Sequence, residues 1–225
     1  MSERLIAVKP YGREQRLGID VQIIDDEATV QDYYQALDEY ILSGTFIRTR
    51  ANANSCEGCP ICCQERIPLT SIDVLTLKKA MAPEQSLNKF LSRYGYVSVE
   101  GPVVDIALGR DEAERCLLLD PVIGKCRNYQ ARPLVCHTYI CTILSPRARK
   151  LREALINSGM DELVRLMLAE GQGKFPVHEA YEPAVNCEDW PENAWSGVEE
   201  YSRLKLKDIL PDKLWSELKK GESSV

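Results

Sequence analysis

The stretch SCEGCPICCQ, residues 55–64, places four cysteines within eight positions of the chain. A second cluster follows downstream, so that eight of the nine cysteines fall into two groups. Clustered free thiols oxidise and cross-link readily, and this density therefore needs a chemical reason. The usual reasons are disulfide bridges or a bound metal whose ligands are thiolates. The clustered cysteines are Cys56, Cys59, Cys62, Cys63, Cys116, Cys126, Cys136 and Cys141.

The composition favours a metal over bridges. With 225 residues and a hydrophobic fraction of 44%, the chain can form a core without covalent staples. The sequence has no apolar stretch of signal-peptide or membrane-spanning length, so we expect no membrane partner and a cytoplasmic location, where thiols stay reduced. The formal net charge of −6 argues against general nucleic-acid binding.

The hydrophobic pattern predicts an α+β fold that is predominantly α-helical, with a small β-hairpin or sheet packed near a cysteine-ligated metal centre. Three consecutive regions are expected: an N-terminal strand and helix extension over 1–51, a cysteine-cluster core over 52–145, and a C-terminal helical region over 146–225 that packs on the core. Strands are expected at 18–24, 96–99, 103–108 and 116–119. Helices are expected at 28–43, from 70 or 71 to about 81, and at 87–94, 146–157, 161–170, 190–206 and 210–220.

The upstream cysteines have the spacing C-x2-C-x2-C, in which the chain curls so that the thiolates face one ion. This spacing is similar to the first three ligands of a ferredoxin-type iron–sulfur loop. The fourth local position is Arg66, so a fourth thiolate must come from the downstream cluster. The neighbouring Cys62 and Cys63 suit a multi-metal centre, or one ligand beside one packed thiol. A thioredoxin-like Cys59–Cys62 pair is an alternative, but no strand leads into it.

Other chemically distinctive residues have plainer explanations. Cys187 is expected to be a buried small hydrophobic residue, and Cys116 is equally compatible with that role. His178 is expected to be solvated in a polar loop, and His137 follows Cys136 directly and is a weaker candidate ligand. A basic run is expected to form a solvated helix face. Its members are Arg147, Arg149, Lys150 and Arg152.

The downstream motif carries a family resemblance. Residues 124–141, GKCRNYQARPLVCHTYIC, together with C-x2-C-x2-C-C upstream, closely resemble the CxxCxxCC, or YkgJ-like, cysteine-cluster family, which is described as a zinc- or iron-chelating domain. The resemblance covers roughly residues 52–145, and a related cysteine pattern occurs in flagellin lysine N-methylases. It implies that all eight clustered cysteines occupy the family's cysteine positions, which makes each of them a candidate metal ligand. The matching non-cysteine positions are Tyr129, Arg132, Pro133 and Tyr139.

The resemblance leaves several roles open. Arg132 either offsets thiolate charge and donates hydrogen bonds to sulfur, or it is a surface arginine. Tyr129 and Tyr139 are expected to shield the cofactor from solvent. Thiolate-rich ligation indicates an iron–sulfur cluster, which we favour here, or zinc. The expected function is a metal-binding protein in metal or redox handling. A cluster-dependent protein-modifying enzyme that resembles the methylases, and a structural zinc module for a protein partner, are the alternatives.

Overall fold

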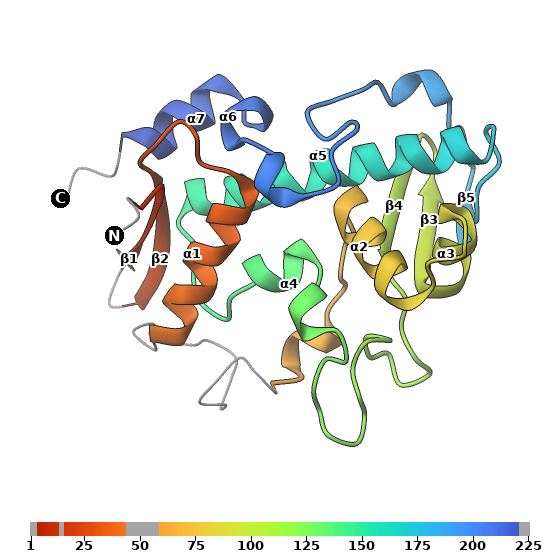
Figure 1. Ribbon diagram of the computed structural model, residues 1–225, viewed down its shortest axis with the longest axis horizontal. Helices are drawn as coiled ribbons and strands as arrows, with labels where there is room; N and C mark the ends of the chain where they lie inside the picture. The colour runs from red at the N-terminus through yellow and green to blue at the C-terminus, as the bar shows by residue number, and fades with distance from the viewer. Residues whose placement is uncertain (1–3, 14–15, 44–58, 221–225) are drawn as a thin grey trace. The chain divides into compact units, whose positions relative to one another are not determined.

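The computed structural model describes residues 4–13, 16–43 and 59–220 (Figure 1). Helices dominate, and they are accompanied by a two-stranded and a three-stranded sheet, which confirms the predicted α+β class. The chain forms two compact units, and each draws on separate stretches of sequence. Unit 1 consists of Met1–Cys56, His137–Leu155 and Glu200–Val225, and unit 2 consists of Glu57–Cys136 and Ile156–Glu199.

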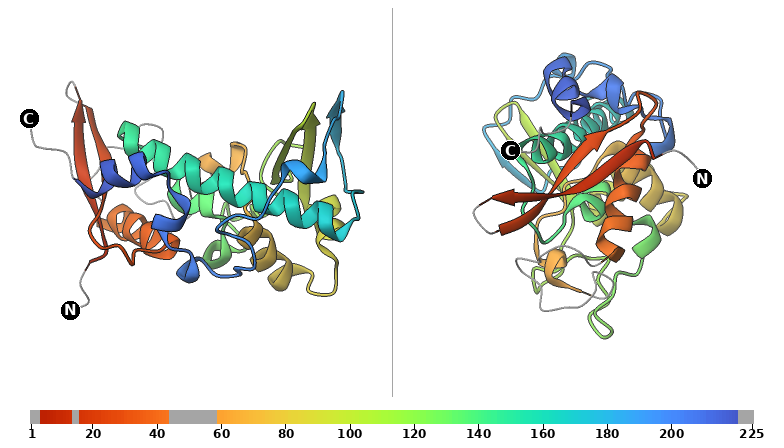
Figure 2. Two further views of the ribbon diagram at one scale, coloured as in Figure 1. Left: turned by 90° about the horizontal axis from the view of Figure 1, so that it is seen from above. Right: turned by 90° about the vertical axis from the view of Figure 1, so that its left-hand side faces the viewer.

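Unit 1 is built on an antiparallel hairpin of β1 (Ile6–Arg13) and β2 (Arg16–Ile23), beside which α1 (Val30–Ser43) packs (Figure 2). Alternate residues of β2, namely Ile19, Val21 and Ile23, are fully buried, as the two-residue period of a strand requires. The prediction of a strand at 18–24 and of the helix at 28–43 is therefore confirmed. The partner strand β1 was not predicted, because its sequence IAVKPYGR breaks the apolar alternation with lysine and proline.

A glycine allows β2 to pack directly on the segment that precedes α5 (Pro146–Glu170). The Ile19 N–H donates to the Ile143 carbonyl at 2.8 Å, and the Ser145 N–H donates to the Ile19 carbonyl at 2.9 Å. A Cβ atom on Gly18 would lie 2.1 Å from the Ile143 carbonyl oxygen, which no side chain permits. The start of α5 is thus anchored to the hairpin by backbone hydrogen bonds.

The first arginine of the basic run does not face solvent. Arg147 is buried and forms an ion pair with the buried Asp20, and its Nη1 donates to the Glu217 carbonyl at 2.6 Å. The prediction of one solvated basic face is therefore wrong for Arg147, although Arg149 and Lys150 are exposed. Burial raises the pKa of Asp20, but hydrogen bonds from Arg147 and Ser145 outweigh it and hold this pKa below its usual range.

Removal of the Asp20 charge should destabilise the protein. Asp20→Asn leaves the Arg147 charge buried without its partner, which typically costs about 3 kcal/mol or more in the free energy of unfolding. The matched control is Glu153→Gln, because Glu153 pairs with the exposed Arg149 at 3.8 Å and such surface pairs contribute under about 1 kcal/mol. Urea denaturation of both variants measures the difference, and equal losses would contradict a special role for the buried pair.

The contribution of the Asp20 carboxylate to stability should also depend on pH. Because the pKa of Asp20 is lower in the folded state than its reference value of 3.8, its contribution is present above that value and is lost as the pH falls through the folded-state pKa. The stability difference between the wild type and Asp20→Asn should therefore shrink below about pH 4. A difference that stays constant from pH 7 to pH 3 would contradict this assignment.

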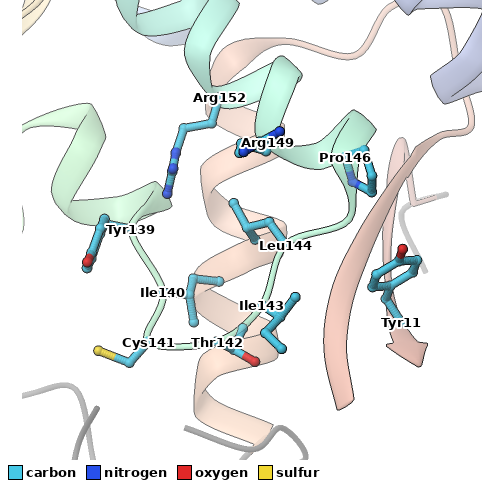
Figure 3. Close-up of a pocket in the computed structure, with 10 residues that line it drawn as sticks. All are labelled: Tyr11, Tyr139, Ile140, Cys141, Thr142, Ile143, Leu144, Pro146, Arg149 and Arg152. Carbon is cyan, nitrogen blue, oxygen red and sulfur yellow. The ribbon is translucent and has the colours of Figure 1, made fainter. Parts of the chain in front are cut away.

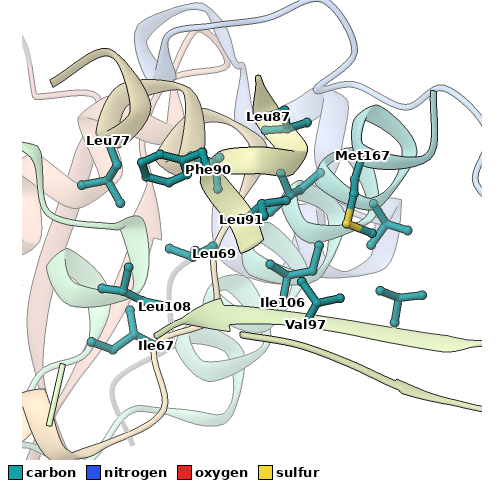
Figure 4. Close-up of a cluster of buried hydrophobic side chains, with 14 of the residues drawn as sticks. Ile67, Leu69, Leu77, Leu87, Phe90, Leu91, Val97, Ile106, Leu108 and Met167 are labelled. Atoms are coloured by element: carbon teal, nitrogen blue, oxygen red, sulfur yellow. The ribbon is translucent and has the colours of Figure 1, made fainter. Parts of the chain in front are cut away.

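Unit 2 contains a three-stranded sheet in the order β4-β3-β5. The hairpin of β3 (Gly95–Glu100) and β4 (Val103–Leu108) confirms the prediction, whereas the short β5 (Glu179–Tyr181), which pairs in parallel with β3, was expected to be loop. Aliphatic side chains of the sheet meet those of α2 (Ser71–Met81), α3 (Leu87–Tyr94) and the later part of α5 in one hydrophobic core (Figure 4).

Side-chain caps begin two of the helices of this unit. Thr70 and Asp73 form a reciprocal capping box at the start of α2, and the Ser86 hydroxyl accepts the Lys89 N–H at the start of α3. The remaining helices and 3-10 turns of the chain are short. They are α4 (Leu134–Thr138), α6 (Leu206–Ile209), α7 (Asp212–Lys219) and the 3-10 turns Ile61–Gln64, Tyr129–Ala131, Cys187–Asp189 and Tyr201–Arg203.

Four predicted elements are wrong in extent or type. Helices at 146–157 and 161–170 form the single helix α5, because Gly159 serves close packing instead of ending the helix. The expected strand at 116–119 is a turn-rich segment that makes only isolated bridges within the described residues, and the expected helix at 190–206 contains turns and the 3-10 turn Tyr201–Arg203. The helix at 210–220 is confirmed as α7.

Gly159 provides a test of this packing. A Cβ atom there would lie 2.7 Å from Thr70 Cγ2 and 2.8 Å from Trp195 Cη2. Gly159→Ala gains up to about 1 kcal/mol of helix propensity, but we expect a net loss of about 1–3 kcal/mol through overpacking. Asn157→Ala, at an exposed position of the same helix, gains propensity without a clash and is the control. Thermal and urea unfolding measure both, and a stabilised Gly159→Ala would contradict the close contact.

Candidate metal centre

Four cysteines come together in unit 2 from separate places in the sequence. Cys63 lies in the 3-10 turn Ile61–Gln64, Cys116 and Cys126 lie in the irregular segment after β4, and Cys136 lies on α4. The Cys116 N–H donates to the Cys63 carbonyl at 2.8 Å, which joins the upstream and downstream clusters. Cys63, Cys126 and Cys136 pack against the hydrophobic core of which Cys116 is a buried member.

The thiols are close enough to influence one another electrostatically. The pKa of Cys116 is raised to about 11, mainly by burial and to a smaller extent by Cys63 and Cys126. Burial also raises the pKa of Cys136 well above its usual value, with further contributions from Cys116, Asp73, Cys126 and Cys63. Burial raises the pKa of Cys63, and Cys126 and Cys59 add to this shift. At neutral pH without a cation, these thiols are therefore protonated.

Backbone N–H donors and a nearby positive charge favour the thiolate form of two cysteines. The Leu118 N–H donates to Cys116 Sγ at 3.4 Å, and a hydrogen bond from the Asn128 backbone opposes the effect of burial on the pKa of Cys126. The positive charge of Arg132 lowers the pKa of Cys126 in the same direction. The guanidinium of Arg132 is held 4.3 Å from the ring centroid of Tyr129, and its Nη1 donates to the Tyr129 carbonyl at 3.1 Å. Arg132 thus lies near the Cys126 thiol, which is compatible with the predicted role of offsetting thiolate charge.

A buried aspartate positions Cys136. Besides capping α2, the Asp73 carboxylate accepts the Leu134 N–H at 2.7 Å, and Leu134 is the first residue of α4. Asp73 therefore connects the start of α2 to the start of the short helix that carries Cys136. This role of Asp73 was not predicted from the sequence. The Thr70–Asp73 spacing signals a capping box, but no sequence signal indicates its second acceptor role.

Four cysteine thiols are suitable ligands for a metal, but their side chains are not arranged here as a coordination shell. Across residues 59–220 and the described N-terminal part, no three cysteine, histidine or carboxylate side chains are arranged so that they could hold an ion. Four thiols with N–H donors to two sulfurs and a guanidinium nearby are nevertheless a ligand set that zinc or an iron–sulfur cluster accepts. Cys59 and Cys62 are half-buried beside Cys63 in the sequence, and Cys56 lies outside the described residues.

The remaining predicted site residues belong to unit 1. Cys141 is buried and, with Tyr139, lines a pocket there. His137 Nδ1 lies 2.8 Å from Asp38 Oδ2, and its ring contacts the Tyr34 ring at a centroid distance of 4.4 Å with the two planes tilted by 35°. The His137 ring is thus fixed by a carboxylate and an aromatic side chain.

Of two predictions about isolated residues, one is wrong. Cys187 is exposed instead of buried, because it lies in a 3-10 turn at the surface. His178 is exposed just before β5, as expected, and in addition its Nδ1 accepts the Val97 N–H at 3.0 Å and its ring stacks on Tyr96. The histidine therefore contributes to the attachment of β5 beside β3.

Loss of the Asp73 carboxylate should be more damaging than loss of an ordinary helix cap. Asp73→Ala leaves the N–H groups of Thr70 and Leu134 buried without this acceptor, and each such loss costs about 1–3 kcal/mol. The control Ser86→Ala removes a single exposed cap of α3 and should cost about 1 kcal/mol. Denaturant unfolding compares the two, and equal costs would show that the bond to Leu134 contributes nothing.

Comparison with known proteins identifies the cysteine segment. Residues 55–157 match the model of the CxxCxxCC family, which is described as "Putative zinc- or iron-chelating domain". The match includes all eight clustered cysteines. Searches of curated proteins and of solved structures each found no match. Among the described residues, none of the helices has both the length and the apolar composition that crossing a bilayer requires.

Proposed function

We propose that residues 55–157, which belong to the CxxCxxCC family of zinc- or iron-chelating domains, bind metal through the thiolates of Cys63, Cys116, Cys126 and Cys136. The observation that supports this assignment is the meeting of these four cysteines in one compact unit, although they come from both sequence clusters. Four thiolates satisfy a tetrahedral zinc ion or the four corners of an iron–sulfur cubane.

Iron bound as an iron–sulfur cluster is the proposed form of the metal. Six of the clustered cysteines are described in unit 2, which is more than one tetrahedral zinc ion needs. Hydrogen bonds to sulfur and a nearby cation are also the means by which proteins adjust the potential of such a cluster. The N–H of Leu118, which donates to Cys116 Sγ, and the guanidinium of Arg132, which lowers the pKa of Cys126, support this proposal. A bound cluster would give the domain a one-electron redox function.

The high pKa values of the thiols describe how the site accommodates a metal. Without a cation, Cys116 and Cys136 are neutral and pack as small apolar side chains. Metal ligation requires thiolates, so binding is coupled to proton release. The buried position of Cys116 among aliphatic side chains favours a closed centre, and this supports a role in metal or redox handling over catalysis.

Metal analysis of cysteine variants tests the ligand set. Cys63→Ser and Cys136→Ser should each reduce the bound metal of anaerobically purified protein by more than half. They should also lower the melting temperature by about 10 °C or more, because ligation free energy is folding free energy. Cys187→Ser, at an exposed cysteine, should change neither property. Unchanged metal content in both ligand variants would overturn the assignment.

The same preparation identifies the metal. Iron and acid-labile sulfide in equal amounts, with a broad visible absorption band, are expected for a cluster. Stoichiometric zinc in a colourless protein would overturn the cluster and leave the cysteine ligand set in place.

A further inference from the structure

A pocket of about 420 Å³ is lined by residues of unit 1, and none of the cysteines proposed to bind metal lines it. Figure 3 shows Arg149 and Arg152 on the first turns of α5, Tyr11 on the hairpin, and the segment between Tyr139 and Pro146 along one side. The volume is in the range of small-molecule sites, which is about 300–1,000 Å³.

The pocket lining is positively charged although the chain as a whole is acidic. Among the described residues, two arginines and no aspartate or glutamate line the pocket, whereas the net charge of the chain is −6. Arg147, on the same turn of α5, is neutralised by Asp20 and does not line the pocket. The electrostatic character of the pocket therefore comes from Arg149 and Arg152.

The two arginines retain donors for a ligand. Arg152 lies over the Tyr139 ring at 5.6 Å from the centroid, and in the described part of the chain it forms no ion pair with a carboxylate. Arg149 is 61% exposed, and its Nε lies 3.8 Å from Glu153, a long surface pair that solvent screens. Because Arg149 and Arg152 are three residues apart on a helix, their side chains occupy neighbouring positions.

The opposite part of the pocket is apolar and rigidly held. Ile140, Ile143 and Leu144 contribute aliphatic surface to the lining. The backbone of this segment is bonded to β2 through the Ile143 carbonyl and through the bridge between Ile19 and Leu144. A fixed apolar wall opposite two guanidinium groups suits a ligand with an anionic group on an apolar body.

We propose that this pocket binds a small organic oxyanion, a phosphate monoester or a carboxylate. Arg149 and Arg152 hold its charged group, and its apolar body lies against Ile140, Ile143 and Leu144. Guanidinium groups recognise phosphate and carboxylate through paired N–H donors, which gives both charge and direction. The N-terminus of α5 adds positive potential on the same side.

Binding measurements on the purified full-length protein, with its metal content unchanged, test the proposal. Isothermal titration calorimetry with phenyl phosphate and with benzoate at fixed ionic strength should show saturable binding of at least one of them. Benzyl alcohol, which has the same apolar body without the charge, should not bind. The relative affinities of phenyl phosphate and benzoate distinguish a phosphate ligand from a carboxylate ligand.

Variants assign the binding to the pocket. Arg152→Gln and Arg149→Gln should each weaken binding at least tenfold. Lys150→Gln removes the same charge from the same helix at an exposed position outside the pocket lining and should change affinity less than twofold. If Arg152→Gln fails to fold, Arg152→Lys and the exposed Arg149→Gln carry the test. No saturable binding of either anion by the wild type, or an equal loss in Lys150→Gln, would overturn the proposal.

Discussion

The carboxylate of Asp73 is the constraint on which the cysteine centre depends. A buried carboxylate is stable only when donors surround it, and Asp73 obtains them from the Thr70 N–H and hydroxyl on one side and from the Leu134 N–H on the other. The five-residue helix α4 is too short to be stable alone, so this bond and its packing fix where the helix begins. Cys136 is thereby held near Cys116, Cys126 and Cys63 by interactions that do not involve a metal.

This arrangement reconciles two interpretations of a buried cysteine. Cys116 is 6% exposed within an aliphatic core, which is the environment of a small hydrophobic residue, and its high pKa keeps it neutral there. The same thiol has an N–H donor from Leu118 and three cysteine neighbours, which is the environment of a ligand. A protonated thiol causes little electrostatic cost in a core, so the packing of unit 2 does not require a metal. In the metal-bound form that we propose, a cation would replace the protons and compensate the thiolate charge.

The parts of the fold that the sequence predicts are those with local causes. The caps at Thr70 and Ser86 lie next to the helices that they begin, and the apolar alternation of β3 and β4 is visible within each strand. Gly159 was misjudged because its reason lies far away in the sequence, where Thr70 and Trp195 leave no room for a Cβ atom. At the site, cysteine spacing indicates the chemistry, whereas the second role of Asp73 depends on Leu134, a partner that no local pattern identifies.

The basic run of α5 shows how one sequence feature divides into different physical roles. Arg147 is buried against Asp20 and stabilises unit 1, while Arg149 and Arg152 line the pocket. A rotation of about 100° per residue separates these directions around the helix, so that adjacent charges in the sequence do not form one patch. Neutralisation of Arg147 leaves two guanidinium groups facing an apolar wall, and it is this pairing of charge with aliphatic surface that favours an organic anion over an inorganic one. The anion pocket and the cysteine centre use residues of different units, and each proposal can therefore fail without the other.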